Sequence, residues 1–406
     1  MAIATGTFKS LVAKIQSGLG SKASAGSAQV YRRVTSNIDM QKDTYKSNEI
    51  RGSMQRADFR HGVRSVAGTI NGELSVGTYQ NFMASVLRGA WAATSAYSAG
   101  TDVTAAATAP QFVDASAGFL TAGLKVGMVG RWTGFAGGSA TTNNDRNFLI
   151  TALTAGNMSG VFLDGTAVVA DAAGDAVTFT PVGKSIFIPA SAHTRDYWTI
   201  EHVFADITQS EQFLDCVFSA MNVKLPATGM ATIEFPVLGL DMDTSTAAYF
   251  TTPTAASSGS VLAAVNGAVY VEGTAVGLIT SMDIAINGNC TSLGGVVGSN
   301  VAPDINRGSF DVSGNMTVLF QDATMRDYFV NETEVSVVAA FTTGNTATAG
   351  FQTFIMSRVK VGGASKDDGE KGLIMTMPFT AIEDTTGGAG TDSNATTITI
   401  QDSAAV

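Results

Sequence analysis

Residues 63–91, VRSVAGTINGELSVGTYQNFMASVLRGAW, pass from a strand pattern to a helix pattern. Residues 63–76 alternate in part between apolar and polar side chains, which predicts a strand. The apolar residues that follow recur three and four positions apart and predict one stripe on a helix of about three turns. Thr78 is the expected N-cap and Gly89 the expected end of this helix. The stripe comprises Phe82, Met83, Val86, Leu87 and Ala90.

Downstream of residue 184 the chain reads mostly as long strands, so we expect a mainly β fold. Residues 216–242 predict a hairpin that turns at 226–229, and residues 308–320, GSFDVSGNMTVLF, alternate strictly. A short helix is expected over 322–332, with Asp322 as its cap. Residues 396–400, TTITI, are expected to pair at a sheet edge.

Between these parts the composition changes to short strand patterns separated by Gly, Asn and Asp turns. This pattern is typical of a small β-barrel or sandwich, which we place at residues 102–183 as an inserted, surface-exposed module. Residues 1–101 then hold an N-terminal arm, a charged loop and the first part of the main domain. Residues 184–406 complete that domain. Within the first part, residues 1–46 have the composition of a weakly structured arm.

The charge is unevenly distributed along the chain. The net charge is −10, yet residues 1–101 hold 12 Lys or Arg against 5 Asp or Glu, whereas residues 184–406 hold 9 against 23. Such a split is typical of a nucleic-acid partner or of self-assembly through opposite charges. No apolar run is long enough to span a membrane, and the N-terminus lacks the apolar core of a signal peptide. The two cysteines are expected to be buried thiols in a reducing compartment.

We find no pattern that indicates an enzyme, a cofactor or a metal site. The three histidines lie outside any nucleophile motif, and no phosphate loop or dinucleotide fingerprint occurs. Asp241 and Asp243 lack the spacing of a calcium loop, so turn residues are favoured there. The same interpretation is favoured over a metal site for Asp164, Asp171 and Asp175.

The stretch 47–65, SNEIRGSMQRADFRHGVRS, concentrates positive charge in an acidic chain. A helix would place Arg56, Arg60 and Arg64 in one row. Three hypotheses remain open: a DNA contact, a solvated loop, and a contact between copies of the chain. We favour the last, because the stacking aromatics of a nucleic-acid reader are missing. The candidate contact residues are Arg51, Arg56, Asp58, Arg60, His61 and Arg64.

The run 47–91 resembles the major tail tube proteins of long-tailed, non-contractile bacteriophages. That family shows a charged loop, a G-x-I-x-x-E-L strand and a helix ending near a tryptophan, matched here by Gly68, Ile70, Glu73–Leu74 and Trp91. Residues 196–207 and 306–337 resemble blocks of the family's second half. The resemblance covers roughly residues 28–101 and 184–401. The segment 102–183 departs from the minimal family form.

The resemblance implies a tail-tube-type β-sandwich with a flanking helix, assembled into rings, generally hexameric, that stack into the tail tube. The partners would be further copies of the chain, other tail proteins (tape measure, terminator and distal tail) and DNA passing through without specific binding. The protein would belong to the virion and assemble in the host bacterial cytoplasm. The acidic second half is the candidate channel wall, since carboxylates repel phosphate.

The inserted module is expected on the outside of such a tube, where it could make weak contact with a host-surface glycan. Trp132 and Phe135 are its candidate stacking platform, although a core pair is the favoured interpretation. Two other classes stay open: a capsid or decoration protein, and a glycan-binding adhesin. A capsid protein usually shows a long helix and a secreted adhesin a signal peptide, and neither pattern is present here.

Overall fold

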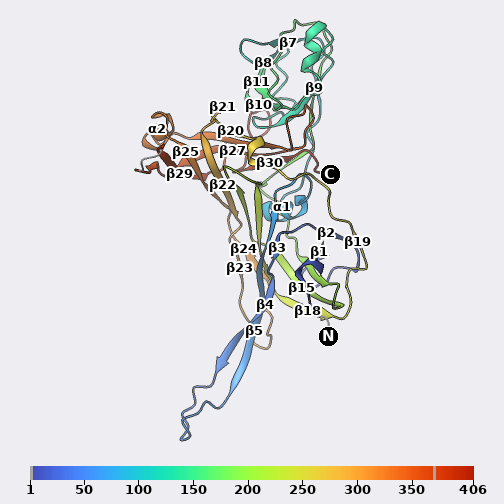
Figure 1. Ribbon diagram of the computed structural model, residues 1–406, viewed down its shortest axis with the longest axis vertical. Coiled ribbons are helices and arrows are strands. Elements are labelled where there is room, and N and C mark those ends of the chain that lie inside the picture. The colour runs from blue at the N-terminus through green and yellow to red at the C-terminus, as the bar shows by residue number, and fades with distance from the viewer. Residues whose placement is uncertain (1–2, 369–371) are drawn as a thin grey trace.

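The computed structural model describes residues 3–368 and 372–406 and consists mainly of strands, which confirms the predicted mainly β class (Figure 1). Two sheet regions joined through β15 form the body. A smaller sheet forms a lobe at one end, and a long hairpin extends from the other end (Figure 1). No helix in the described ranges is both long and apolar enough to cross a membrane.

The first sheet region packs the N-terminal segment against the middle of the chain. Leu11 and Ala13 on β1 are buried, and β1 pairs along its whole length with β14. The expected weakly structured arm over 1–46 is therefore wrong, because its flexible composition belongs only to the loop 16–25 between two paired strands. The strands in spatial order are β19 (Thr252–Thr254), β2 (Gly26–Tyr31), β1 (Lys9–Ile15), β14 (Trp198–Phe204), β15 (Gln209–Phe218) and β18 (Asp241–Ser245).

The second sheet region is larger and curves into a half-barrel. It starts with β5 (Phe59–Glu73), which pairs on one side with β3 (Thr35–Ser36) and β4 (Asp39–Lys46). From β5 the order continues through β17 (Thr232–Gly239), β16 (Ala220–Leu225), β22 (Ile279–Asn287), β25 (Asp311–Leu319), β29 (Ile374–Ala381), β27 (Phe351–Val361), β26 (Val335–Thr342), β20 (Gly267–Val271) and β21 (Thr274–Ala275).

Shorter strands complete this region. β28 (Ser365–Lys366) pairs with β29, while β13 (Lys184–Phe187) and β30 (Thr399–Asp402) extend the sheet beside β27. β30 thus has a partner on each side, and the expectation that the segment around it pairs at an edge is wrong. Its burial explains the difference, since Ile398 and Ile400 are fully covered. A separate ribbon joins β23 (Cys290–Ser292) to β24 (Ile305–Arg307).

The core lies between the half-barrel and the helix α1 (Gln80–Leu87), where Phe82 is the centre of an aromatic cluster. Its ring centroid lies 4.1 Å from that of Tyr31 and 4.3 Å from that of Phe218. The predicted apolar stripe is confirmed except for Ala90, which is exposed beyond the helix end. The predicted cap is wrong: Thr78 instead accepts a hydrogen bond from the Ser75 hydroxyl at 2.8 Å, and no side chain caps the helix.

The helix ends at Leu87, two residues before the predicted Gly89, because Arg88 adopts the left-handed conformation with φ of 52°. The Arg88 guanidinium donates to the carbonyls of Gly288 and Gly308, which holds the following chain against the ribbon. The second predicted helix is present as α2 (Thr324–Val330). The predicted cap is wrong, because Ala323 occupies the N-cap position and no side chain caps the helix; Asp322 lies one residue earlier and accepts a hydrogen bond from the Thr324 backbone N–H at 2.9 Å.

The lobe consists of residues 97–181 and has an apolar core of its own. Its sheet begins at Tyr97, a little before the expected start at residue 102. The strands in order are β6 (Tyr97–Ser98), β12 (Thr178–Pro181), β9 (Val129–Thr133), β10 (Phe148–Leu153), β11 (Asn157–Phe162), β8 (Gln111–Asp114) and β7 (Val103–Ala106). Short 3-10 turns lie at Gly6–Phe8, Gly138–Asn143 and Ala264–Asn266.

Candidate assembly surfaces

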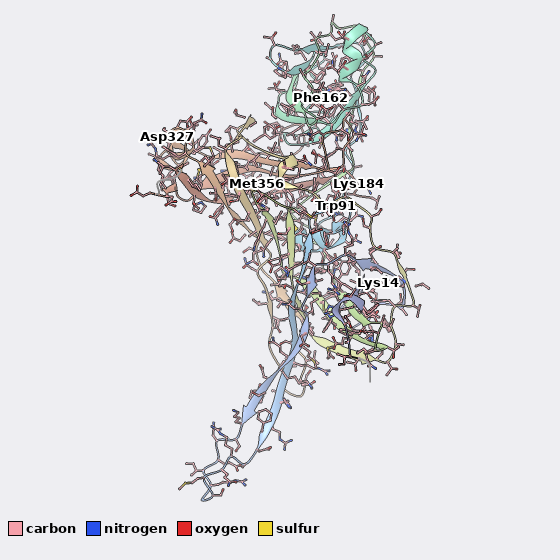
Figure 2. All side chains as sticks on the ribbon, in the orientation of Figure 1. Lys14, Trp91, Phe162, Lys184, Asp327 and Met356 are labelled. Atoms are coloured by element: carbon pink, nitrogen blue, oxygen red, sulfur yellow. The ribbon has the colours of Figure 1, made fainter. Side chains whose placement is uncertain are left out.

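The long hairpin, residues 39–67, extends from the body as a two-stranded ribbon, and its side chains project on both sides (Figure 2). Its tip, residues 47–58, exposes Ile50 and Met54 almost completely, with relative accessibilities of 102% and 98%. Tyr45 and Phe59 are also exposed on the adjoining strands. A two-stranded ribbon is only marginally stable alone, and exposed apolar side chains grouped at its end indicate a surface that another molecule covers.

The structure places the predicted arginines on this hairpin rather than on a helix. Arg60 and Arg64 lie on β5 and Arg56 lies in the tip, so the helical row is wrong. The backbone groups that a helix would use are instead hydrogen-bonded between β4 and β5. His61 lies on β5 beside Phe59, with the two rings in an edge-on arrangement at 5.2 Å.

The arginine side chains divide into an anchored and an exposed group. Arg64 forms a 2.7 Å ion pair with Asp241 at the base of the hairpin, where both side chains are partly buried. Its backbone N–H also donates to the Asn300 carbonyl at 2.8 Å. Nearer the tip, Arg60 pairs with Asp58 at 3.0 Å and Arg51 with Glu49 at 3.1 Å, both in exposed positions. Exposed pairs contribute little stability, so these charges can exchange partners at small cost.

Arg56 forms no ion pair with any carboxylate in the described part of the chain, and its side chain is exposed. An unpaired cation next to exposed apolar side chains suits a contact with an acidic, partly apolar surface. Arg64 therefore fixes the base of the hairpin within its own subunit, while the tip is available to a partner.

One face of the half-barrel is polar across six neighbouring strands, from β5 to β29. The strand registers align Glu73, Thr232, Lys224, Asp283, Asn315 and Pro378 in one row, and the rows beside it are equally polar. None of the side chains on this face is fully buried. Its charged members are the carboxylates of Glu73, Glu234, Asp283 and Asp311 and the amine of Lys224, so the face is acidic.

The opposite face of the same strands is apolar and buried, for example at Val223, Ile284 and Met316. Buried apolar residues, or glycine, occupy every second position of these strands, so a shift of one residue in register would exchange the two faces. The polar face carries no aromatic or arginine side chain on which a nucleic acid could stack or be held. Its net negative charge repels polyanions.

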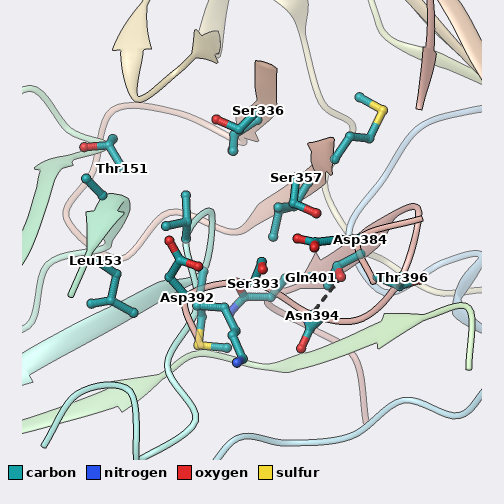
Figure 3. Close-up of a pocket in the computed structure, with 18 of the residues that line it drawn as sticks. Thr151, Leu153, Ser336, Ser357, Asp384, Asp392, Ser393, Asn394, Thr396 and Gln401 are labelled. Atoms are coloured by element: carbon teal, nitrogen blue, oxygen red, sulfur yellow. Dashed lines mark hydrogen bonds between the residues drawn. The ribbon is translucent and has the colours of Figure 1, made fainter. Parts of the chain in front are cut away.

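The lobe joins the body through a small apolar cluster and a cavity of about 360 Å³ (Figure 3). In the cluster, Val129 and Leu149 of the lobe pack with Tyr270 and Phe351 of the body. The Gln401 side chain also bridges the parts, because its amide bonds both the N–H and the carbonyl of Val129 at 2.8 Å.

Lys125 extends from the lobe to the loop 384–396 and donates to two carbonyls there, those of Gly388 and of Thr391, the latter at 2.6 Å. Burial lowers the pKa of the Lys125 ammonium, while the nearby carboxylate of Asp392 acts in the opposite direction. Asp384 folds this loop: burial opposes its ionisation, yet hydrogen bonds from Ser393 and Thr386 hold its pKa below the usual value. These contacts tie the lobe to the loop beside the cavity.

Elsewhere the titratable groups have structural surroundings. His202 is 1% exposed, and its Nε2 lies 2.7 Å from the Ser36 hydroxyl. Burial lowers its pKa to about 3, and the charges of Lys9 and Arg33 act in the same direction, so the ring is neutral at ordinary pH. Burial raises the pKa of the Cys216 thiol, which makes it unreactive.

Among the described residues no group of three or more His, Cys, Asp or Glu could hold a metal ion. Asp241 and Asp243 instead form ion pairs with Arg64 and Lys22, at 2.7 and 3.0 Å. Asp164 pairs with Arg146 inside the lobe.

The candidate stacking platform in the lobe is wrong. Trp132 and Phe135 are 0% and 2% exposed, and their ring centroids lie 5.8 Å apart within the apolar core of the lobe. Phe112 packs against both rings, at 4.7 and 5.7 Å. The favoured alternative, a core pair, describes these residues, because a sheet this small needs its large aromatic side chains inside to bury enough apolar area.

No sequence pattern predicted a role for Ile50, Met54 or Lys125, or the pairing of Arg64 with Asp241. Nothing local marks Lys125 or Asp241, because their partners are distant in the chain. The polar face can be recognised in the sequence of β25, where Ser313, Asn315 and Thr317 alternate with apolar residues or glycine.

A comparison with family models matches residues 9–389 of the chain to a family described as phage tail tube protein. The matched range includes the long hairpin, the six strands of the polar face and the lobe. The search of curated proteins finds no match to this chain.

Proposed function

The chain belongs to the phage tail tube protein family, and we propose from this membership that six copies form a ring. Such rings stack into the tube of a long, non-contractile tail. Family membership supports a structural role for the chain in the virion tail. We also propose roles for the polar face, the long hairpin and the lobe. We assign assembly to the host bacterial cytoplasm, with the tape measure, terminator and distal tail proteins as neighbours at the tube interior and its ends.

The observation that carries the proposal is the polar face of the half-barrel. A ring of such half-barrels places six strands per subunit around a central channel, with the apolar faces inside each subunit. Four carboxylates and one lysine per subunit then give the channel wall a negative charge. A wall of this kind repels the phosphates of DNA and lets the genome pass without binding.

The long hairpin supports stacking by heterologous contacts, in which one surface of a copy meets a different surface of the next. Such contacts propagate into a tube when the relation between copies does not close on itself. The exposed tip, with Arg51, Arg56 and Asp58, is the surface that reaches the neighbouring ring, with Arg60 beside it at the start of β5. His61 and Arg64 follow on β5 toward the base of the hairpin.

We place the lobe on the outside of the tube and treat it as a separately folding insert between residues 102 and 183. Its own core and its position at the end of the body away from the hairpin support this assignment (Figure 1). The two ends of the insert lie side by side, because Ala99 donates its N–H to the Val177 carbonyl at 3.0 Å. A short linker can therefore replace the lobe. With its large aromatic side chains inside, the lobe offers decoration of the tube and at most weak contact with the host surface.

Negative-stain electron microscopy of the purified protein at near-physiological salt tests the proposal. We expect hollow tubes or stacked rings with regular outward projections, and closed shells would contradict the tube function. A variant in which a Gly-Ser linker replaces the whole lobe, residues 97–181, is the matched sample. It should form tubes of the same bore without projections. Loss of its assembly, with the wild type intact, would show that the lobe is needed for the tube and is not only decoration.

A further inference from the structure

The hairpin tip and helix α2 lie at opposite ends of the same sheet. β5 starts at the hairpin, and its last residue, Glu73, pairs with Thr232 at the far end. The strand registers place the end of β25, at Leu319, at the same end of the sheet as Glu73. Leu319 directly precedes the loop into α2. Figure 2 shows the same separation, with Asp327 of α2 at one side of the molecule and the hairpin tip at another. A head-to-tail stack along the strands brings one end of each copy near the other end of the next.

The far end contains an apolar groove of about 350 Å³ between β21, the end of β25 and α2. Val276, Leu278, Met325 and Tyr328 contribute to its lining. Beside it, Phe329 and Val330 of α2 are exposed at 40% and 63%. We call this feature the α2 groove. It is larger than one aliphatic side chain and open at the surface, so it can accept a side chain from another molecule.

Carboxylates at the α2 groove are available to pair with a cation. The Asp322 carboxylate lies in the lining, and its only hydrogen bond within the described chain uses one oxygen, at the start of α2. Glu272 lies on the adjoining turn and is exposed. The cations nearby are engaged: Arg326 pairs with Asp327 at 2.8 Å, and the Lys366 ammonium lies 3.6 Å from the Phe320 ring centroid.

We propose that the hairpin tip of one copy docks in the α2 groove of the next copy, with Met54 or Ile50 in the apolar groove and Arg56 paired with Asp322. The occupant is thus a second copy of this chain. The inference rests on the head-to-tail stacking of the proposed function and names the surface that receives the tip. The two surfaces are complementary. The tip exposes the apolar side chains of Ile50 and Met54 beside Arg56, and the α2 groove offers an apolar lining beside the Asp322 carboxylate.

Cysteine crosslinking between two variants tests the contact. One variant carries Met54→Cys and the other Ala275→Cys, an exposed position in the groove lining, both in a Cys290→Ser background. Cys216 is fully buried and can stay. We expect a covalent dimer only in the mixture of the two variants, in the pelleted stacks and also in the soluble fraction. Val265→Cys, 84% exposed at the same end but outside the groove, is the matched control.

The outcomes separate this inference from the proposed function. Stacks that form a 54–265 crosslink instead of a 54–275 crosslink would overturn the groove assignment and leave the tube function standing. Absence of the mixed dimer from both fractions would also overturn it. Closed shells from the wild-type chain would instead refute the tube function itself.

Charge reversal provides a second measurement that does not depend on cysteine chemistry. Arg56→Glu puts two like charges in contact, so we expect the protein concentration needed for sedimenting stacks to rise by about tenfold or more, because six contacts per ring weaken together. Asp322→Arg should act in the same way. The double variant restores an opposite pair and should recover most of the loss. A double variant as impaired as the two single changes combined would contradict the pairing.

Discussion

The buried His202 provides a quantitative test of how the N-terminal segment is held. It lies on β14 and meets Ser36 across the hydrogen bond that joins this segment to the sheet. Its pKa of about 3 in the folded protein lies below the ordinary value of 6.5. The unfolded chain therefore takes up a proton first as the pH falls. The histidine contributes no penalty above pH 6.5, and stability is lost progressively from there down to about pH 3.

The expected size follows from the two pKa values. Between pH 7.5 and pH 5.0 the unfolded histidine becomes almost fully protonated while the folded one stays neutral, which costs about 2 kcal/mol of unfolding free energy. His202→Gln keeps a hydrogen-bonding group and cannot titrate. Urea unfolding at both pH values, at concentrations where the protein is monomeric, gives the free energies of wild type and variant. We expect the advantage of the wild type over the variant to shrink by about 2 kcal/mol at pH 5.0.

Comparing the two proteins removes the contribution of other groups. Burial raises the pKa of Asp402 to about 6, so acid favours its folded form and acts in the opposite direction to His202. This group is present in both proteins and cancels in the difference. A difference that stays constant between the two pH values, within about 0.5 kcal/mol, would refute the assignment of His202 as a buried neutral group.

Three further substitutions test the packing and the contacts. Lys125→Met removes the two hydrogen bonds to the loop 384–396, so we expect the free energy of unfolding to fall by about 1–3 kcal/mol and amide exchange in that loop to become faster. Lys224→Met, at an exposed position, should leave the unfolding free energy and the amide exchange unchanged. Gly72→Ala drives a methyl group into the Tyr79 hydroxyl and should destabilise by about 2 kcal/mol or more in thermal unfolding, whereas Gly52→Ala has open space and should change stability little. Asp241→Asn breaks the partly buried pair with Arg64, so we expect faster proteolysis at the base of the hairpin and an unfolding free energy lower by about 1 kcal/mol.

The sequence predicted those parts of the fold in which a local period decides the structure. The hairpin that turns at 226–229 is confirmed, with β16 and β17 on either side of the turn. The apolar stripe of α1 is confirmed because Phe82, Met83, Val86 and Leu87 share one face of a short helix. These elements bury a face that their own spacing defines, so neighbours in the chain carry enough information.

Elsewhere the structure depends on contacts between distant residues, which no local pattern shows. Residues 9–15 become a central strand only because β14, far along the chain, supplies the partner. The cluster at 56–64 has helical spacing in its arginines, yet β4 pairs with it and the strand prevails. A core position was the favoured interpretation for Trp132, yet only the folded lobe shows that Phe112 and Phe179 are the rings that pack against it. The candidate assembly residues remain predictions, because a single chain does not include the copies that would meet them.

The charge asymmetry of the sequence acquires a spatial meaning through β5. This one strand carries Arg60 and Arg64 near the hairpin, and its far end, with Glu73, pairs with β17 from the acidic second half of the chain. Its first half leaves the sheet with β4, whereas its second half forms the edge of the acidic polar face with β17. In the proposed function, a cation near the start of the strand would attach the hairpin to another copy, and a carboxylate near its end would repel a polyanion. Moving the positive charge into the second half, as in Asn71→Arg, would place arginine beside Glu234 on the proposed channel wall. Tubes of this variant should form as the wild type does and retain added DNA in a salt-dependent manner, which wild-type tubes should not; equal retention by both would show that this face does not line the channel.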